Sequence, residues 1–220
     1  MTASVYFVSG IDTGIGKTYV TGYLAKIWRE QGQHAITQKL VQTGNSDISE
    51  DIEKHREIMG EGWFKEDDLK LTMPEIFSYP ASPHLATKID GREIDFAKIE
   101  SATQQLAENY DVILLEGAGG LMVPLTDDLL TIDFLCEKQY PIILVTSGRL
   151  GSINHTLLSL ESIARRGLNL FALAYNLNDE SQDSIISKDT ADYLKRYLTR
   201  SFPKARWVDV PKIEPFKKPD

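Results

Sequence analysis

A glycine-rich loop follows the first apolar run of this chain, and it constrains the fold more than any other feature. Residues 5–10 lead directly into Gly-Ile-Asp-Thr-Gly-Ile-Gly-Lys-Thr, which ends at Thr18 and opens an amphipathic helical pattern. In such a unit, backbone N–H groups converge on phosphate oxygens, and the helix N-terminus adds partial positive charge. Lys17 would reach the β- and γ-phosphates, and the Thr18 hydroxyl would bind Mg²⁺. The loop therefore predicts binding of Mg-ATP.

The loop is slightly wider than the common form. Gly10 precedes Gly16 by one residue more than in the usual spacing G-x4-G-K-S/T. A G-K-T triplet alone could mark a helix N-terminus with a solvated lysine. Its position between a strand-like run and a helix favours nucleotide binding.

Strand-like and helix-like segments alternate along the rest of the chain. Several strand-like runs are apolar on consecutive residues, as expected for parallel strands covered on both faces by helices. This alternation predicts right-handed β-α-β crossovers and an α/β fold. We expect a doubly wound, mostly parallel sheet with helices on both faces, like that of P-loop NTPases. The expected strands are residues 5–10, 35–41, 112–117, 142–147, 170–176 and 206–210, and the expected helices are residues 17–31, 48–59, 96–109, 129–137, 153–166 and 184–199.

Chain length indicates the domain organisation. The 220 residues suffice for one well-buried α/β domain and are few for two, so we expect a single domain over residues 1–220. The stretch 60–91, which contains Pro74, Pro80 and Pro83, is the least regular part. We expect it to form a long excursion on the domain surface.

Charge and cysteine content argue against several classes of partner. A formal net charge of -8 disfavours nucleic acid and membrane surfaces, since both attract an excess of Lys and Arg. Cys136 is the only cysteine, which excludes an internal disulfide and a zinc site with several thiolates, and which fits a reducing cytoplasm. We see neither a secretion signal nor an apolar run of the ~18 residues that a membrane span requires. We expect a cytoplasmic protein that acts on small molecules.

Polar residues follow two of the apolar runs. Glu116-Gly117-Ala118-Gly119-Gly120 ends one expected strand, and Lys39 lies at the end of another. Ligands of open parallel sheets bind at the carboxyl ends of strands, so Glu116 is placed to meet the metal of the nucleotide. Lys39 could neutralise a charged substrate or a transferring phosphoryl group. The alternatives are a helix-capping carboxylate and a solvated lysine.

Two later positions could also bind ligands. Residues 147–155 follow a strand and open a helix, which makes them a potential anion site with free N–H groups. Asn176 ends an apolar strand and could either contact a base edge or cap a turn.

Taken together, these motifs resemble those of the dethiobiotin synthetase family, the ATP-dependent carboxylases of biotin biosynthesis. The match runs from Tyr6 to about Ile213. Each motif alone would be weak, whereas all of them in this order are a strong match. They are G-x-D-T-x-x-G-K-T at the phosphate loop, K-x-V-x-S/T-G from Lys39, S-P-H at residues 82–84, E-G-A-G-G from Glu116, V-P-L at residues 123–125 and L-G-x-I-N-H from Leu150.

The resemblance implies a reaction without a protein nucleophile. 7,8-Diaminopelargonic acid would take up CO₂ as a carbamate on one amine, and ATP would phosphorylate the carbamate to a carbamic-phosphoric anhydride. The second amine would then close a cyclic urea with loss of phosphate. This fits a chain whose only cysteine lies outside every motif and which lacks a serine-hydrolase elbow. Catalysis would consist of positioning and of stabilising negative charge.

By this resemblance, Thr18, Asp51 and Glu116 would hold Mg²⁺. Asp47 and Glu50 are acidic neighbours of Asp51, and the sequence alone does not fix the helix register that would choose among the three.

The resemblance also assigns the substrate contacts. Lys17 and Lys39 would flank the carbamate, and Thr13 and Thr43 would hydrogen-bond the substrate head. The substrate carboxylate would lie near a helix start and near a tyrosine from a second subunit, because the family works as a homodimer. The residues implied for this tail site are Ser152, Ile153, Asn154 and Tyr193.

ATP would contact the phosphate loop, the metal ligands, the turn after Glu116 and an adenine site. The residues implied are Gly14, Ile15, Gly16, Lys17, Thr18, Tyr19, Asp51, Glu116, Gly117, Ala118, Gly119, Asn176, Pro211, Lys212 and Ile213.

Two other functions compete with this interpretation. A nucleotide-driven switch of the partitioning class would carry an extra lysine early in the loop, where this chain has Asp12. A related amidoligase would need a glutamine-hydrolysing domain with a nucleophilic cysteine, for which 220 residues leave no room.

Overall fold

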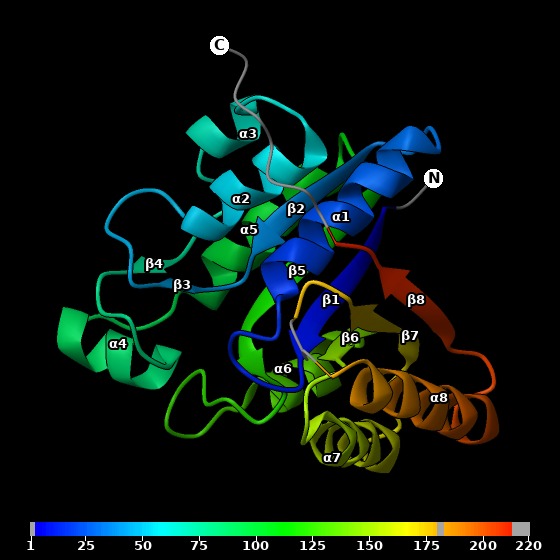
Figure 1. Ribbon diagram of the computed structural model, residues 1–220. Helices are drawn as coiled ribbons and strands as arrows, with labels where there is room; N and C mark the ends of the chain where they lie inside the picture. The colour runs from blue at the N-terminus through cyan, green and yellow to red at the C-terminus, as the bar shows by residue number, and fades with distance from the viewer. Residues whose placement is uncertain (1–2, 180–182, 213–220) are drawn as a thin grey trace.

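The computed structural model describes residues 3–179 and 183–212 (Figure 1). Within them, six strands form the main sheet in the order β2-β5-β1-β6-β7-β8, and each neighbouring pair is parallel. The predicted α/β class with a doubly wound parallel sheet is confirmed. The strands are β1 (Ser4–Gly10), β2 (Ala35–Lys39), β5 (Val112–Gly120), β6 (Ile142–Ser147), β7 (Leu170–Asn176) and β8 (Arg206–Val210).

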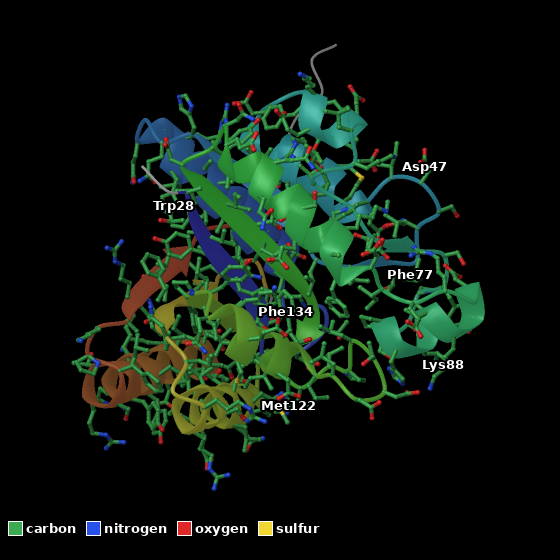
Figure 2. All side chains as sticks on the ribbon, turned by 180° about the vertical axis from the view of Figure 1, so that it is seen from behind. Trp28, Asp47, Phe77, Lys88, Met122 and Phe134 are labelled. Atoms are coloured by element: carbon green, nitrogen blue, oxygen red, sulfur yellow. The ribbon has the colours of Figure 1, made fainter. Side chains whose placement is uncertain are left out.

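Helices cover both faces of this sheet, because adjacent strand residues point to opposite sides. Val8 packs with α1 (Lys17–Glu30), which lies beside α2 (Glu50–Met59). Phe7 packs on the other face, where its ring lies 6.3 Å from that of Phe134, near the middle of Figure 2. The helices of that second face are α5 (Phe96–Ala107), α6 (Thr131–Lys138), α7 (Ser152–Arg165) and α8 (Ser184–Ser201).

The chain reverses its winding direction at β1. It first crosses from β1 by way of α1 to β2 on one side, and it later crosses from β5 by way of α6 to β6 on the other. The carboxyl end of β1 is therefore a topological switch point, where open parallel sheets leave a crevice for ligands.

Between β2 and α5 the chain leaves the main sheet and forms a smaller unit (Figure 1). There, β3 (Gln42–Thr43) pairs in parallel with β4 (Ile76–Phe77) beside α4 (Pro83–Asp90), and the short helix α3 (Lys65–Asp68) precedes β4 in the chain. The prediction of an irregular surface excursion over residues 60–91 is wrong for its inner part. Asp67, Met73 and Phe77 are buried, because the segment packs against α2 and β2.

Strand ends differ slightly from expectation for a visible reason. β2 stops at Lys39, two residues early, and the chain then enters β3, where the backbone N–H of Gln42 donates to the backbone carbonyl oxygen of Glu75 in the excursion at 2.8 Å. β5 continues to Gly120. Among the described residues, no helix combines the length and apolar content that crossing a membrane requires. That residues 1–220 form a single domain stays a prediction.

Candidate active site

A cavity of about 880 Å³ opens at the carboxyl ends of β1, β2 and β5, at the switch point. The phosphate loop forms one wall, and the excursion forms another with Pro80, Ala81, Ser82 and Pro83. Most of the predicted site residues line this cavity. They are Thr13, Gly14, Gly16, Lys17, Thr18, Tyr19, Lys39, Thr43, Asp51, Glu116, Ala118 and Gly119.

Ile15 and Asn176 fix the phosphate loop to the core of the domain. Ile15 is fully buried in the core, and its carbonyl oxygen accepts a hydrogen bond of 2.9 Å from Asn176 Nδ2. Gly16 has a φ of 93°, and a Cβ there would lie 2.1 Å from Asn176 Nδ2. Only glycine fits this position, because the backbone is left-handed and the neighbouring amide is so close.

Lys17 extends along the cavity wall. Its side chain is buried, and its Nζ donates to the carbonyl oxygen of Asp12 at 3.4 Å. Burial lowers its pKa below the usual value, an effect that the nearby Glu116 carboxylate partly offsets. An anionic phosphate bound beside this buried lysine would stabilise its charged form.

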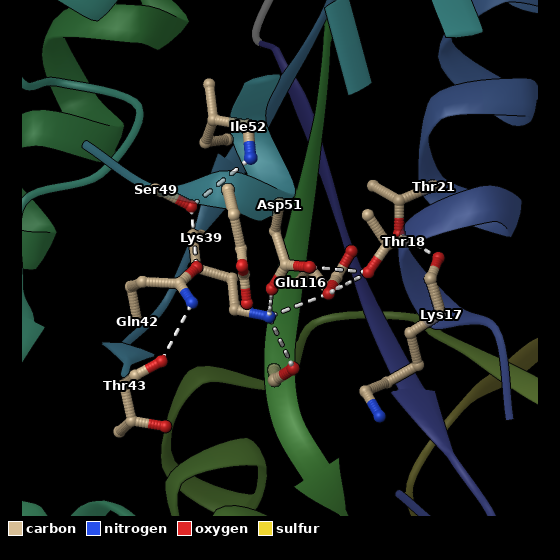
Figure 3. A network of polar contacts seen from close by, with 12 residues as sticks. Lys17, Thr18, Thr21, Lys39, Gln42, Thr43, Ser49, Asp51, Ile52 and Glu116 are labelled. Carbon is tan, nitrogen blue, oxygen red and sulfur yellow. Dashed lines mark hydrogen bonds and ion pairs between the residues drawn. The ribbon is translucent and has the colours of Figure 1, made fainter. Parts of the chain in front are cut away.

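Three oxygen-bearing side chains meet at the cavity floor (Figure 3). Thr18 Oγ1 donates to Asp51 Oδ1 at 2.6 Å and lies 3.5 Å from Glu116 Oε1. Two carboxylates and a hydroxyl suit Mg²⁺, which takes oxygen ligands and usually keeps several waters and phosphate oxygens. In the part of the chain that the structure describes, no group of three or more His, Cys, Asp or Glu side chains could hold a metal. Phosphate and water would complete this coordination.

The start of α2 decides which acidic residue faces Thr18. Ser49 caps the helix, since its Oγ accepts from the N–H of Ile52 at 3.2 Å and donates to Gln42 at 2.6 Å. This register turns Asp51 toward Thr18. The side chain of Asp47 is 82% exposed and pairs instead with Lys70.

Lys39 lies between the two carboxylates. Its Nζ is 2.7 Å from Glu116 Oε1 and forms an ion pair with Asp51 (Figure 3). Burial opposes the charge on Lys39, but the two carboxylates outweigh it and raise its pKa to about 12. Burial likewise opposes ionisation of Glu116, and the opposing charge of Lys39 with the bond from His55 holds the pKa of Glu116 well below its usual range. Lys39 is thus buried and charged, not a solvated strand-end lysine.

His55 is a site residue that the sequence analysis missed. Its Nε2 lies 2.9 Å from Glu116 Oε2, and its side chain is fully buried. A lone histidine in a helical segment does not indicate a contact with a distant carboxylate. Its spacing of four residues from Asp51 places both on one helix face, which is the only available hint.

The predicted residues of the substrate tail lie outside this cavity. Ser152 is buried at the start of α7, and Asn154 lines a separate hollow of about 420 Å³ between α7 and α8. Tyr193 is 39% exposed on α8. Within one chain these residues do not join Thr43.

The predicted adenine residues form a second group beside the phosphate loop. Asn176 Oδ1 accepts from the N–H of Asn178 at 3.0 Å, and Asn178 Nδ2 donates to the carbonyl oxygen of Pro211 at 2.8 Å. Lys212 follows, and Ile213 lies outside the described residues. Gly117 lies on β5 against Phe7, where a Cβ would come within 2.6 Å of the ring.

Asp12, which stands where switch proteins of the partitioning class carry an extra lysine, forms an ion pair. Asp12 Oδ2 lies 2.8 Å from an Arg149 guanidinium nitrogen, which connects the phosphate loop to the loop before α7.

Comparisons with known proteins agree with this geometry. A family model described as an AAA domain matches residues 4–202. The ATP-dependent dethiobiotin synthetase BioD 2 of Pasteurella multocida is 51% identical over 91% of this chain and 94% of its own length. The ATP-dependent dethiobiotin synthetase BioD of Chlorobaculum tepidum is 50% identical over 90% of this chain and 84% of its own length.

Solved structures support the fold. The cell division protein FtsY of Thermotoga maritima has a TM-score of 0.53 at 18% identity, covering 98% of this chain. The signal recognition particle receptor FtsY of Elizabethkingia anophelis, in complex with GDP, has a TM-score of 0.54 at 15% identity, covering 99% of this chain. The chain spans 65% and 61% of those proteins, and at such identities the likeness concerns the fold alone.

Proposed function

The chain belongs to the dethiobiotin synthetase family, and we propose that it converts 7,8-diaminopelargonic acid, CO₂ and ATP into dethiobiotin, ADP and phosphate. One observation supports this most directly. Lys17, Lys39 and the oxygen set of Thr18, Asp51 and Glu116 line one cavity, which suits the joining of two anions.

ATP binds with its phosphates on the phosphate loop. Backbone N–H groups from residue 14 to residue 19 surround the phosphates, and Lys17 contacts the β- and γ-phosphates. Thr18, Asp51 and Glu116 would hold Mg²⁺, which would neutralise charge on the phosphate oxygens. The adenine lies near Asn176, Pro211 and Lys212, with Ile213 next in sequence.

The first chemical step joins the diamine to CO₂. One amine attacks the carbon of CO₂, loses a proton and becomes a carbamate, whose head is oriented by Thr13 and Thr43. A carbamate oxygen then attacks the γ-phosphorus, the bond to the β-γ bridging oxygen breaks, and ADP leaves. Lys39 has three N–H donors. Two hold Glu116 and Asp51, and the third, whose nitrogen lies 3.5 Å from the carbonyl oxygen of Gly117, can turn to the carbamate.

The second step closes the ring. The remaining amine attacks the carbonyl carbon of the carbamic-phosphoric anhydride, and the bond to the phosphate oxygen breaks. Phosphate leaves and the amine loses a proton, which gives the cyclic urea of dethiobiotin. The protein contributes orientation and charge stabilisation in these steps.

The substrate tail requires a second copy of the chain, so the active protein is a homodimer in the cytoplasm. Ser152, Ile153 and Asn154 of one subunit and Tyr193 of the other receive the carboxylate of the diamine. A hollow of about 310 Å³ reaches from Thr13 to Leu158 of α7, and Leu158 also lines the hollow that contains Asn154.

The test is phosphate release with the diamine, bicarbonate and Mg-ATP, each omitted in turn, with dethiobiotin identified by mass. Phosphate release should require all components. Equal ATP hydrolysis without diamine and bicarbonate would contradict the proposal and favour a nucleotide-driven switch.

A further inference from the structure

The two carboxylate oxygens of Glu116 have different partners. Oε1 lies 2.7 Å from Lys39 Nζ and 3.5 Å from Thr18 Oγ1, on the cavity side (Figure 3). Oε2 points away from the cavity and meets only buried surroundings, where His55 Nε2 lies at 2.9 Å. A carboxylate held at both oxygens cannot rotate freely.

The hydrogen-bond pattern assigns the proton on His55. An ionised carboxylate only accepts, so Nε2 is the donor. The other ring nitrogen, Nδ1, is buried and has no hydrogen-bond partner in residues 3–179 and 183–212. A proton on Nδ1 would be a buried donor without an acceptor, which costs free energy. His55 is therefore assigned as the Nε2–H tautomer.

The backbone fixes the place from which His55 acts. His55 and Asp51 lie four residues apart on one face of α2, whose first turn is capped by Ser49. α1 approaches this helix closely, since a Cβ at Gly22 would lie 3.3 Å from His55 Cα. α2 thus supplies one proposed metal ligand, Asp51, and also His55, which contacts another proposed ligand, Glu116.

We infer that His55 is a positioning residue, which orients Glu116 so that Oε1 faces Thr18 and the Mg²⁺ of the bound nucleotide. This inference rests on the metal role of Glu116 in the proposed function. Without His55, Oε2 loses its donor and the carboxylate can turn. Loss of a hydrogen-bond partner behind a metal ligand typically weakens metal affinity by about 10- to 100-fold.

The experiment compares three variants of the full chain by calorimetry of ADP binding at increasing Mg²⁺. His55→Leu fills the space without a donor, and we expect it to need about tenfold more Mg²⁺ for half-maximal ADP binding. His55→Gln places an amide N–H near the position of Nε2, and it should stay within about threefold of the parent. Ile52→Val is the control for mild core disturbance in α2, and it should leave the Mg²⁺ dependence unchanged.

An unchanged Mg²⁺ dependence in a folded His55→Leu variant would overturn the inference, because a residue that only fills space predicts that result. If His55→Leu does not fold, His55→Asn replaces it, since its amide is too short to reach Glu116. Equal Mg²⁺ dependence of His55→Asn and His55→Gln would also overturn the inference.

This readout needs no diamine, so the two proposals can fail separately. A parent protein that binds Mg-ADP but makes no dethiobiotin would refute the proposed function and leave the role of His55 intact.

Discussion

Lys39 is the residue whose surroundings say most about its chemistry. Its ammonium is buried and paired with both Glu116 and Asp51. Buried ion pairs cost desolvation free energy and often add little net stability, so stability alone is a weak reason for this arrangement. A role as the cation that neutralises two anions during phosphoryl transfer explains the arrangement better.

We expect Lys39→Ala to lower kcat by about a hundredfold, because a charge-assisted donor is removed from the transition state. ADP affinity at saturating Mg²⁺ should change little. Lys39→Arg should recover only part of kcat, since a planar guanidinium does not replace a compact ammonium. Steady-state kinetics with ATP and diamine varied separately measure this. Lys88→Ala, which removes an exposed lysine of α4, is the control, and a normal kcat in Lys39→Ala would contradict the prediction.

Position along a strand was enough to predict that Lys39 and Glu116 lie at the cavity. Lys39 ends β2 and lies opposite Glu116 of the neighbouring strand β5, near the carboxyl edge of the sheet where ligands of parallel sheets bind. The sequence alone did not single out Asp51 among its acidic neighbours, because the direction of its side chain depends on the Ser49 cap, which is fixed by a hydrogen bond to the side chain of Gln42 on β3. His55 was missed because its role comes from a tertiary contact with Glu116.

At the scale of elements, the distance between α1 and α2 controls the site. Gly22 lies one turn after Thr18, and a Cβ there would come within 3.0 Å of Ile58 Cβ. The absence of a side chain at Gly22 lets α2 bring Asp51 to Thr18.

Gly22→Val should therefore separate the two helices and raise the Mg²⁺ needed for ADP binding several-fold. Overpacking should also reduce the free energy of unfolding by about 1–3 kcal/mol. Calorimetry and urea unfolding measure the two effects. The double variant Gly22→Val with Ile58→Ala opens space for the new side chain, and it should recover part of both losses. Unchanged Mg²⁺ dependence in Gly22→Val would show that the helix spacing is not critical.

The excursion after α2 depends on a buried ion pair. Arg56 forms two hydrogen bonds with Asp67, of 2.8 and 2.7 Å, and a third of 2.8 Å with Thr37 on β2. This explains why the excursion was poorly predicted: polar contacts between distant residues leave no apolar period in the sequence. The main strands were predicted well because their apolar runs are local.

We expect Asp67→Asn to lower the free energy of unfolding by about 3 kcal/mol, since Arg56 would stay buried without its anion.

Burial raises the pKa of Asp67, but the bonds from Arg56 and Thr72 outweigh it, and the net shift is downward. A lowered pKa contributes stability above the unfolded-state value of 3.8, and this contribution is lost as pH falls below it. Between pH 5 and pH 3, the free energy of unfolding of Asp67→Asn should therefore fall less than that of the parent, as measured by urea unfolding. The exposed neighbour variant Asp68→Asn is the control. Equal acid sensitivity of Asp67→Asn and the parent would contradict this assignment.

At the scale of the whole molecule, the predicted site is divided between two regions. The residues proposed to bind phosphate and metal meet at the switch point, whereas Ser152, Asn154 and Tyr193 lie on α7 and α8. The resemblance named both groups, but the sequence could not show that one chain keeps them apart, because strand order is set by tertiary packing.

The surface between these regions carries exposed apolar side chains. Leu150 is 84% exposed, Leu158 is 56% exposed, and Met122 is 54% exposed. Figure 2 shows Met122 at the end of the molecule where α7 lies. Exposed apolar groups of this kind favour association between proteins.

If this surface forms the interface of the proposed homodimer, Leu158→Asp should weaken association, because a charge would be buried among apolar side chains. Sedimentation at assay concentration should show monomers, and dethiobiotin formation should fall by about tenfold or more as the tail site is lost. Mg-ADP binding should persist, since Thr18, Asp51 and Glu116 belong to one chain. Leu69→Asp is the matched control, because Leu69 is 57% exposed and lies on the excursion. It should remain dimeric and active. If Leu158→Asp is monomeric and forms dethiobiotin at the parent rate, each subunit works alone, and the tail residues of the partner have no part in the reaction.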